Sequence, residues 1–168
     1  MAKLEIKIYP DHVLRKKARP VEKAGSDERK LAYDMIETMR SANGVGLAAP
    51  QVGISKRIIV AEDTEGDNKV VLVLVNPKII SKKGRTSFCE GCLSLPGVTS
   101  DVVRPEFITV EALNLDGDMF KINAEGLLSR IIQHEIDHLD GIVFIDRIGI
   151  LKRKKIIKQL GAKVCVEF

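Results

Sequence analysis

The chain has 168 residues, of which 45% are hydrophobic and 30% charged, and 27 basic and 23 acidic residues give a formal net charge of +4. This length and balance predict one folded domain, residues 1–168, and exclude a disordered or fibrous protein. Its apolar runs are far shorter than the roughly 20 residues that cross a bilayer, and residues 1–5 lack the apolar core of a signal peptide. We therefore expect a cytoplasmic location and no membrane partner.

The numbers of cysteine and aromatic residues reduce the range of functions that the chain can have. Three cysteines cannot pair evenly, which favours ligand or catalytic roles over disulfides. Aromatic residues make up only 4% of the chain, which argues against recognition of nucleic acid by base stacking. We expect no DNA partner.

The first predicted elements are one helix and two strands. An amphipathic helix is expected from Ser26, its predicted N-cap, to about Ala42. The segments 57–61 and 70–75 are rich in Ile and Val and predict strands, joined by a polar loop through residues 66–68.

The middle of the chain predicts extended structure. Asn76-Pro77 is expected to interrupt the second strand. Several glycines and a proline predict an extended, bent segment over residues 84–100. The segments 107–113 and 119–122 flank Asp116-Gly117, a strong signal for a β-hairpin.

A second long helix is predicted from Leu127 to Leu139, with Asn123 as its cap and Gly141 as its C-terminal stop. Apolar residues nearly encircle this helix, which marks it as buried. A basic helix over about residues 151–160 is expected to close the chain. Helices of this length among many short strands predict an α+β fold with an N-terminal helix, a buried central helix and a C-terminal helix.

The buried helix carries His134-Glu135-Ile136-Asp137-His138. Two histidines four residues apart lie about 40° from each other around a helix and one turn apart, so both can ligate one ion. Glu135 is turned about 100° from His134 and can reach a metal-bound water without being a ligand. Burying these polar groups without partners would cost several kcal/mol. We therefore predict a metal site rather than structural histidines.

A third protein ligand is not evident downstream, where Asp140, Asp146, Cys165 and Glu167 are poor candidates. The segment 89–94 upstream contains two cysteines. A thiolate from this segment would complete a site whose fourth position is open to water.

Three segments carry a resemblance to a known family. Residues 44–51 read Gly-Val-Gly-Leu-Ala-Ala-Pro-Gln, residues 90–94 read Glu-Gly-Cys-Leu-Ser, and the histidine segment follows. In this order they resemble the peptide deformylase pattern G-x-G-x-A-A-x-Q, E-G-C-x-S and H-E-x-x-H, over essentially the whole chain. The resemblance implies antiparallel β-sheets around a central metal-binding helix. It also implies an enzyme that removes the N-formyl group from the formylmethionine of nascent polypeptides and releases formate.

The resemblance implies Cys92, His134 and His138 as metal ligands. It implies Fe²⁺ as the usual native metal, with Zn²⁺, Ni²⁺ or Co²⁺ as replacements. Cys89 is not part of the pattern, and we assign the metal to Cys92 and treat Cys89 as a filler residue. The alternative is that the two cysteines exchange roles.

The same resemblance implies Glu135 as the general acid/base. The Gln51 side chain and the backbone N–H of Leu93 are implied as oxyanion donors. A solvated loop residue is the alternative for Gln51. Glu90 and Asp137 are candidates to accept the second N–H of the ligand imidazoles, with a helix-surface salt bridge as the alternative for Asp137.

Substrate contacts are expected on both sides of the metal. The candidates are Val45, Gly46, Gly91, Arg104, Leu127, Arg130 and Ile131. Val45-Gly46 and the strand near Gly91 could pair with an extended peptide. The three candidates on the buried helix would line a pocket for the methionine side chain, with Arg130 reaching its rim. Arg104 is either a peptide contact or a surface arginine.

The basic C-terminal helix has two interpretations. It is a solvated face with Ile156, Ile157 and Leu160 packed inward, or it makes a transient contact with ribosomal RNA phosphates. His12 is expected to be exposed and uninvolved. Two other functions stay open: a metallopeptidase that shares only the histidine helix, and a non-enzymatic metal- or RNA-binding module.

Overall fold

The computed structural model describes residues 2–64 and 69–164, and side chains as far as Gly161. The described helices are α1 (Ser26–Ser41), α2 (Gly126–Leu139) and α3 (Ile150–Val164), with short 3₁₀ turns η1 (His12–Arg15), η2 (Ala49–Val52) and η3 (Phe144–Arg147). The strands are β1 (Gly46–Ala48), β2 (Ile58–Asp63), β3 (Val70–Lys83), β4 (Thr86–Cys92), β5 (Leu95–Arg104), β6 (Phe107–Leu113) and β7 (Met119–Ala124). The predicted loop through residues 66–68 lies outside the described residues.

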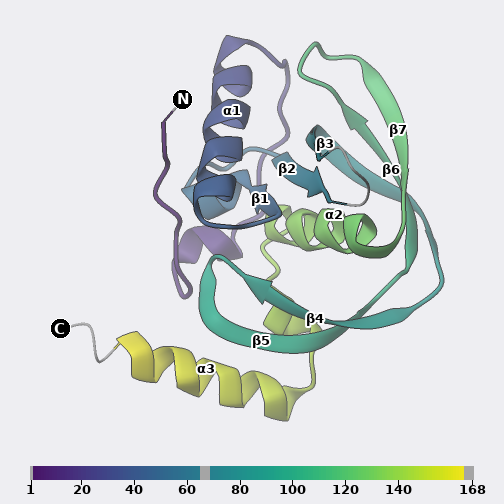
Figure 1. Cartoon of the computed structure of the whole chain (residues 1–168). Helices are drawn as coiled ribbons and strands as arrows, with labels where there is room; N and C mark the ends of the chain where they lie inside the picture. The colour runs from purple at the N-terminus through teal and green to yellow at the C-terminus, as the bar shows by residue number, and fades with distance from the viewer. Residues whose placement is uncertain (1, 65–68, 165–168) are drawn as a thin grey trace.

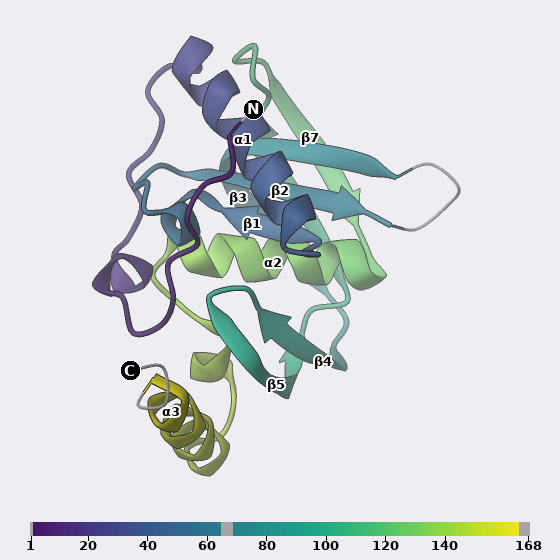
Figure 2. The same cartoon turned by 60° about the vertical axis from the view of Figure 1, so that its left-hand side comes forward.

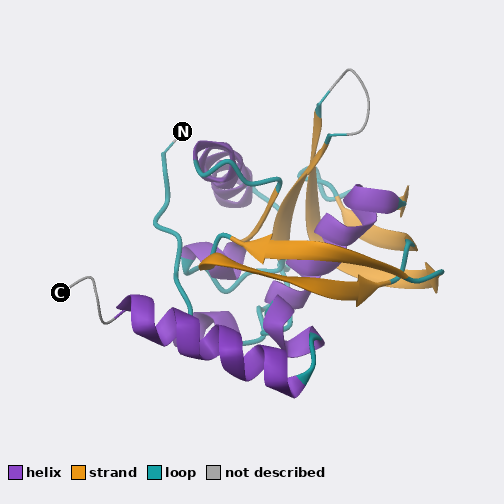
Figure 3. Ribbon diagram, turned by 60° about the horizontal axis from the view of Figure 1, so that its bottom comes forward, coloured by secondary structure: helices purple, strands orange, loops and turns teal. Residues whose placement is uncertain are grey.

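The strands form two antiparallel sheets with α2 between them. One sheet has the order β1-β2-β3-β6-β7, and β4 and β5 form a separate hairpin. Figures 1 and 2 show α2 lying between the larger sheet and the hairpin, and α1 on the opposite face of that sheet. Figure 3 shows α3 on the outer side of the hairpin. The predicted α+β fold is confirmed.

Strand β2 explains how the sheet separates two cores. Successive side chains of a strand point to opposite faces. Ile59 and Ala61 therefore pack with α2, while Ile58 and Val60 pack with α1. All four are fully buried, and fully burying an Ile or Val side chain contributes about 1.5–3 kcal/mol. The apolar sequence of this strand thus anchors both long helices.

A third hydrophobic cluster joins the hairpin to the C-terminal region. It includes Val102 from β5, Phe144 from η3, and Ile156 and Leu160 from α3. Ile157, also expected to pack inward, is exposed instead. No helix in the described ranges combines the length and apolarity that a bilayer span requires.

The expected interruption at Asn76-Pro77 is confirmed as an irregularity within β3, which continues beyond it to Lys83. Asn76 has a left-handed backbone conformation with φ of 51°, and the pairing with β6 shifts register between Val75 and Lys78. The Asn76 amide accepts a hydrogen bond from the Val21 N–H and donates one to the Val21 carbonyl, both 2.8 Å. The irregularity is therefore a β-bulge that holds the N-terminal segment.

Two predicted helix caps are also wrong. Gly25, not Ser26, precedes α1, and its N–H donates to the Glu28 carboxylate at 3.0 Å. Asn123 belongs to β7, and Glu125 occupies the N-cap of α2. The predicted stop at Gly141 is confirmed, since its φ of +74° is the left-handed conformation that commonly follows a helix.

Candidate metal centre and active-site cleft

Three side chains that can ligate a metal meet where β4 ends above α2. The sulfur of Cys92 and ring nitrogens of His134 and His138 all lie within 4.8 Å of one another. The Cys92 Sγ is 3.2 Å from Nε2 of His138. Ligand atoms of a tetrahedral ion with bonds of about 2.0–2.3 Å lie roughly 3.5 Å apart. The three groups therefore fit one ion, and a thiolate with two imidazoles suits Fe²⁺, Zn²⁺, Co²⁺ or Ni²⁺.

The two histidines have opposite electrostatic surroundings. Burial alone would lower the pKa of His134, but hydrogen bonds with Cys92 and Glu90 raise it well above its ordinary value. Burial and the nearby His134 lower the pKa of His138. The Nδ1 atom of His138 is buried and has no hydrogen-bond partner among the described groups. The lowered pKa favours the neutral form of His138, and a neutral imidazole is the form that ligates a metal.

Glu90 on β4 is the centre of a buried ion cluster. It accepts hydrogen bonds from His134 Nδ1 at 3.1 Å, from Arg104 Nε and Nη2 at 2.6 and 2.9 Å, and from Arg130 Nη1 at 2.5 Å. Burial would raise the pKa of Glu90, but its hydrogen bonds with His134 and Arg104 lower it to about 2. The expected contact between Glu90 and a candidate ligand imidazole is confirmed.

Arg104 lies inside this cluster, so neither prediction for it was right. Its side chain is 2% exposed, and its Nη1 donates to Asp137 at 2.8 Å. Asp137 also accepts two hydrogen bonds from Arg147, each 2.5 Å, and no contact of Asp137 with a histidine is seen among the described side chains. Asp137 is thus a partner of two arginines, one of them buried. The alternation of Val98, Val102 and Arg104 on one face of β5 was the sequence signal for this burial.

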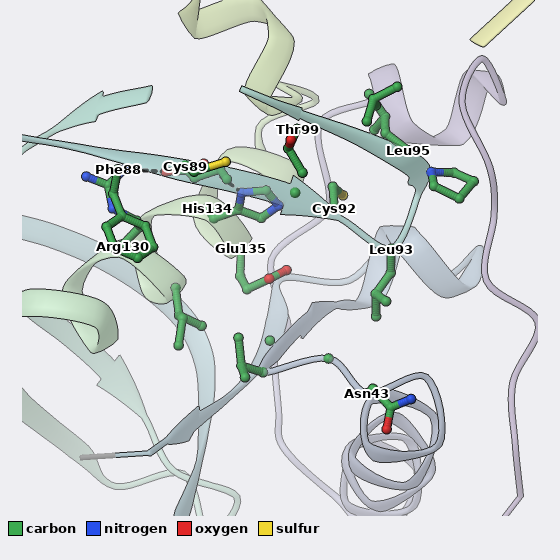
Figure 4. A pocket seen from close by; sticks show the side chains of 18 of the residues that line it. Asn43, Phe88, Cys89, Cys92, Leu93, Leu95, Thr99, Arg130, His134 and Glu135 are labelled. Atoms are coloured by element: carbon green, nitrogen blue, oxygen red, sulfur yellow. Dashed lines mark hydrogen bonds and ion pairs between the residues drawn. The ribbon is translucent and has the colours of Figure 1, made fainter. Parts of the chain in front are cut away.

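Glu135 points into the space beside the candidate ligands (Figure 4). Its carboxylate is buried, and Oε2 has no hydrogen-bond partner within the described part of the chain. Burial raises the pKa of Glu135 to about 7, against the opposing effect of His134 and Arg104. A Cβ on Gly46 would lie 2.5 Å from Glu135 Oε1 and 2.7 Å from Ile131 Cγ2. Only glycine lets β1 approach α2 this closely.

Gln51 on η2 faces the same site. The side chain is 1% exposed, so the alternative of a solvated loop residue is wrong. Its Oε1 accepts the Ala48 N–H at 2.8 Å, which orients the amide. Its Nε2 lies 3.5 Å from Cys92 Sγ and 3.3 Å from Ser94 Oγ. The donor end of Gln51 is therefore held against the candidate metal centre.

A cleft of about 460 Å³ opens above these groups. Six of the seven predicted substrate contacts line it: Val45, Gly46, Gly91, Leu127, Arg130 and Ile131. Arg104 does not line this cleft. Arg130 does not reach the rim as expected, because its guanidinium also donates to the Val102 and Thr86 carbonyls. Phe88 was missed by the sequence reasoning, yet it lines the cleft with 57% of its surface exposed, and the Arg130 guanidinium lies 5.7 Å from its ring centroid.

The two cysteines of the 89–94 segment are placed differently. Cys89 is exposed on the cleft wall, whereas Cys92 is the cysteine near the two histidines. Figure 4 shows Cys92 next to His134, with Leu93 and Asn43 further along the pocket. The geometry agrees with Cys92, rather than Cys89, as the candidate ligand.

The fold and the site together define an α+β protein in which a buried helix and a β-hairpin bring a thiol and two imidazoles to the floor of one cleft. Residues 3–154 match the family model described as polypeptide deformylase, and the chain belongs to this family of metal-dependent enzymes. It is 50% identical over 164 residues to a peptide deformylase of Thermodesulfovibrio yellowstonii, covering 97% of this chain and 99% of that protein.

Solved structures of peptide deformylases are similar to this chain in fold and in sequence. A crystal structure of a peptide deformylase from Legionella pneumophila is similar with a TM-score of 0.91 and 46% identity, covering 99% of this chain and 98% of that one. The peptide deformylase of Thermus thermophilus has a TM-score of 0.87 and 46% identity, covering 95% and 94%. The resemblance seen in the three sequence segments is confirmed, and the chain is an enzyme.

Proposed function

We propose that this enzyme hydrolyses the formamide bond of N-terminal formylmethionine in nascent polypeptides and releases formate. The observation that carries the proposal is the meeting of Cys92, His134 and His138 beside the buried carboxylate of Glu135, in a chain of the deformylase family. Residues 1–168 would form a single catalytic domain. Because nascent chains are made in the cytoplasm, the proposed substrate implies a cytoplasmic location.

Cys92, His134 and His138 would hold one divalent ion, natively Fe²⁺, with Zn²⁺, Ni²⁺ or Co²⁺ able to replace it. When bound, this ion would polarise the formyl carbonyl and lower the pKa of a bound water. Metal analysis of two variants tests the ligand assignment. Cys92→Ala should lose the metal and Cys89→Ala should keep it, and the reverse result would exchange the two cysteines.

Glu135 would move the proton during hydrolysis. The hydroxyl of the attacking water adds to the formyl carbon while its proton passes to the Glu135 carboxylate. The carbon–nitrogen bond then breaks as Glu135 delivers this proton to the departing amine. A pKa of about 7 suits a group that must accept and donate a proton near neutral pH.

Gln51 and Leu93 would stabilise the charge that develops on the formyl oxygen. The Gln51 Nε2 group already faces the candidate centre, and its Oε1 is held by the Ala48 N–H. A buried neutral amide donates a hydrogen bond without needing a counter-ion. The backbone N–H of Leu93 would be the second donor.

The peptide would extend along the cleft between β1 and the hairpin. Val45 and Gly46 would pair with its backbone on one side and Gly91 on the other, by addition of a strand. Leu127 and Ile131 would contact the unbranched methionine side chain.

The proposal is tested by Glu135→Gln, with formate release from a formyl-Met peptide and metal content measured on the same anaerobic sample. We expect activity to fall about 10²- to 10⁴-fold with the metal retained. The matched control is Glu111→Gln. Glu111 lies on β6, and its carboxylate is close to Lys121 on β7. Full activity in Glu135→Gln would contradict the assigned role. Cleavage of internal peptide bonds would favour the metallopeptidase, and absence of hydrolysis by the metal-loaded wild type would favour a binding module.

Helix α3 would make the proposed transient contact with the ribosome. Lys152, Lys154, Lys155 and Lys158 are exposed on it, while its apolar side packs on the hairpin. Replacing these four lysines by glutamine should abolish cosedimentation with ribosomes and leave formate release from a free peptide unchanged. Undiminished cosedimentation would contradict this contact and favour the alternative of a solvated helix face.

A further inference from the structure

A second cavity, of about 300 Å³, lies on the far side of α2 from the cleft. The cleft is lined from α2 by residues such as Ile131 and Glu135, and the second cavity by Gln133 and Ile136. Successive residues of a helix are turned by about 100°, so these two sets face in nearly opposite directions. We call this cavity the back pocket; its other walls come from β3, the end of β5 and η3.

Basic side chains dominate the back pocket. Its lining includes five basic residues, Arg57, Lys78, Lys82, Arg104 and Arg147, and two acidic ones, Asp137 and Asp140. Both carboxylates are already engaged by arginines. Asp137 accepts from Arg104 and Arg147, and Asp140 accepts from Arg57 Nη1 at 2.7 Å. The acidic side chains therefore leave the lysines uncompensated.

Lys78 and Lys82 are the two basic residues of the back pocket that form no ion pair with the described residues. Both are exposed on β3. Glu111 is opposite Lys78 on β6, but its carboxylate lies 3.6 Å from the Nζ of Lys121 on β7. Two ammonium groups at one concave surface raise the local concentration of small anions.

The remaining walls suit an anion with a small organic part. Ile79, Ile136 and Val103 contribute apolar surface beside the basic groups. A phosphate monoester carries about −1.5 to −2 charges at pH 7, which matches two lysines, and has three acceptor oxygens. A carboxylate would neutralise only one of them. We propose that the back pocket binds a small phosphate monoester through Lys78 and Lys82.

The shape of the pocket disfavours a nucleic-acid strand. An RNA backbone presents a row of phosphates and needs an extended basic track. Here the basic residues line one cavity, whose volume is near the lower size limit of small-molecule pockets.

The test is titration of the metal-loaded enzyme with phenyl phosphate by calorimetry, at an ionic strength held constant with sodium chloride. We expect saturable binding that weakens at least tenfold in the double variant Lys78→Ala/Lys82→Ala. The double variant Lys78→Arg/Lys82→Arg should retain it. Lys83→Ala is the matched control, because Lys83 is the next residue on β3 and does not line the back pocket; it should change the affinity less than twofold.

All three variants should release formate at the wild-type rate, since the lysines lie on the far side of α2, and this shows that they are folded. The proposal is overturned if binding does not saturate, if the double alanine variant binds as the wild type does, or if Lys83→Ala weakens binding equally. Displacement of phenyl phosphate by a single-stranded RNA oligonucleotide at lower concentration would overturn the small-ligand assignment.

Discussion

The ion cluster around Glu90 makes a quantitative prediction about the metal centre. Glu90→Gln keeps the size of the side chain but removes the charge that Arg104, Arg130 and His134 share. The Glu90 side chain is only 4% exposed, so solvent does not screen the loss. Removing one partner of a buried ion pair destabilises a protein by about 3–5 kcal/mol, because the other charge stays buried and unpaired. Arg104 keeps its pairing with Asp137, and we therefore expect the lower end, about 3 kcal/mol.

The same change should also weaken metal binding. The carboxylate of Glu90 accepts from the Nδ1 of His134, and loss of such a partner typically lowers metal affinity about 10- to 100-fold. Urea unfolding of the metal-free protein measures the first effect, and competition with a chelator measures the second. Glu111→Gln serves as the control. A Glu90→Gln protein with wild-type stability and metal affinity within twofold would refute the idea that this cluster positions His134.

Other changes have distinct expected results. Gly46→Ala should lower formate release with the metal retained, because the added Cβ would meet Glu135 Oε1 at 2.5 Å; an unchanged rate would show that β1 can shift freely. Gln51→Ala should reduce kcat/KM by the equivalent of about 2.7–4 kcal/mol if Gln51 is an oxyanion donor, and steady-state kinetics on a formyl-Met peptide measure this. Asp146 has a lowered pKa: burial would raise it, but hydrogen bonds from Arg15 and a backbone N–H outweigh burial. Its contribution to stability is therefore full above about pH 4 and is lost as the pH falls further. The difference in unfolding free energy between the wild type and Asp146→Asn should shrink from pH 7 to pH 3, and a constant difference would contradict this.

Local patterns predicted the long helices and the placement of two histidines on one face of α2. The spacing of His134 and His138 depends only on helix geometry, and Gly141 follows the helix in the conformation that only glycine adopts easily. These features arise within a few residues of the chain, so periodicity and turn chemistry are enough to find them.

Features that depend on distant partners could not be predicted in this way. The bulge at Asn76 is held by Val21, which lies 55 residues earlier in the chain. From its residue type alone, Arg104 is expected at the surface, because an arginine is seldom fully buried unless it is paired. Its burial depends on carboxylates of two other elements, Glu90 and Asp137. The alternation along β5 indicates that Arg104 lies on the buried face, but no local pattern identifies the carboxylates that pair with it.

The candidate metal centre also depends on contacts between distant segments of the chain. Cys92 lies on a hairpin that belongs to a separate sheet from the one that packs on α2, so strand pairing does not set its distance from the histidines. The hairpin is joined to α2 beside the site by side-chain contacts, among them the pairing of Glu90 with Arg130 and His134. Glu90 stands two residues before Cys92, so we expect these contacts to position the sulfur as well. The Glu-Gly-Cys motif therefore combines a candidate ligand with the carboxylate that orients the opposite imidazole.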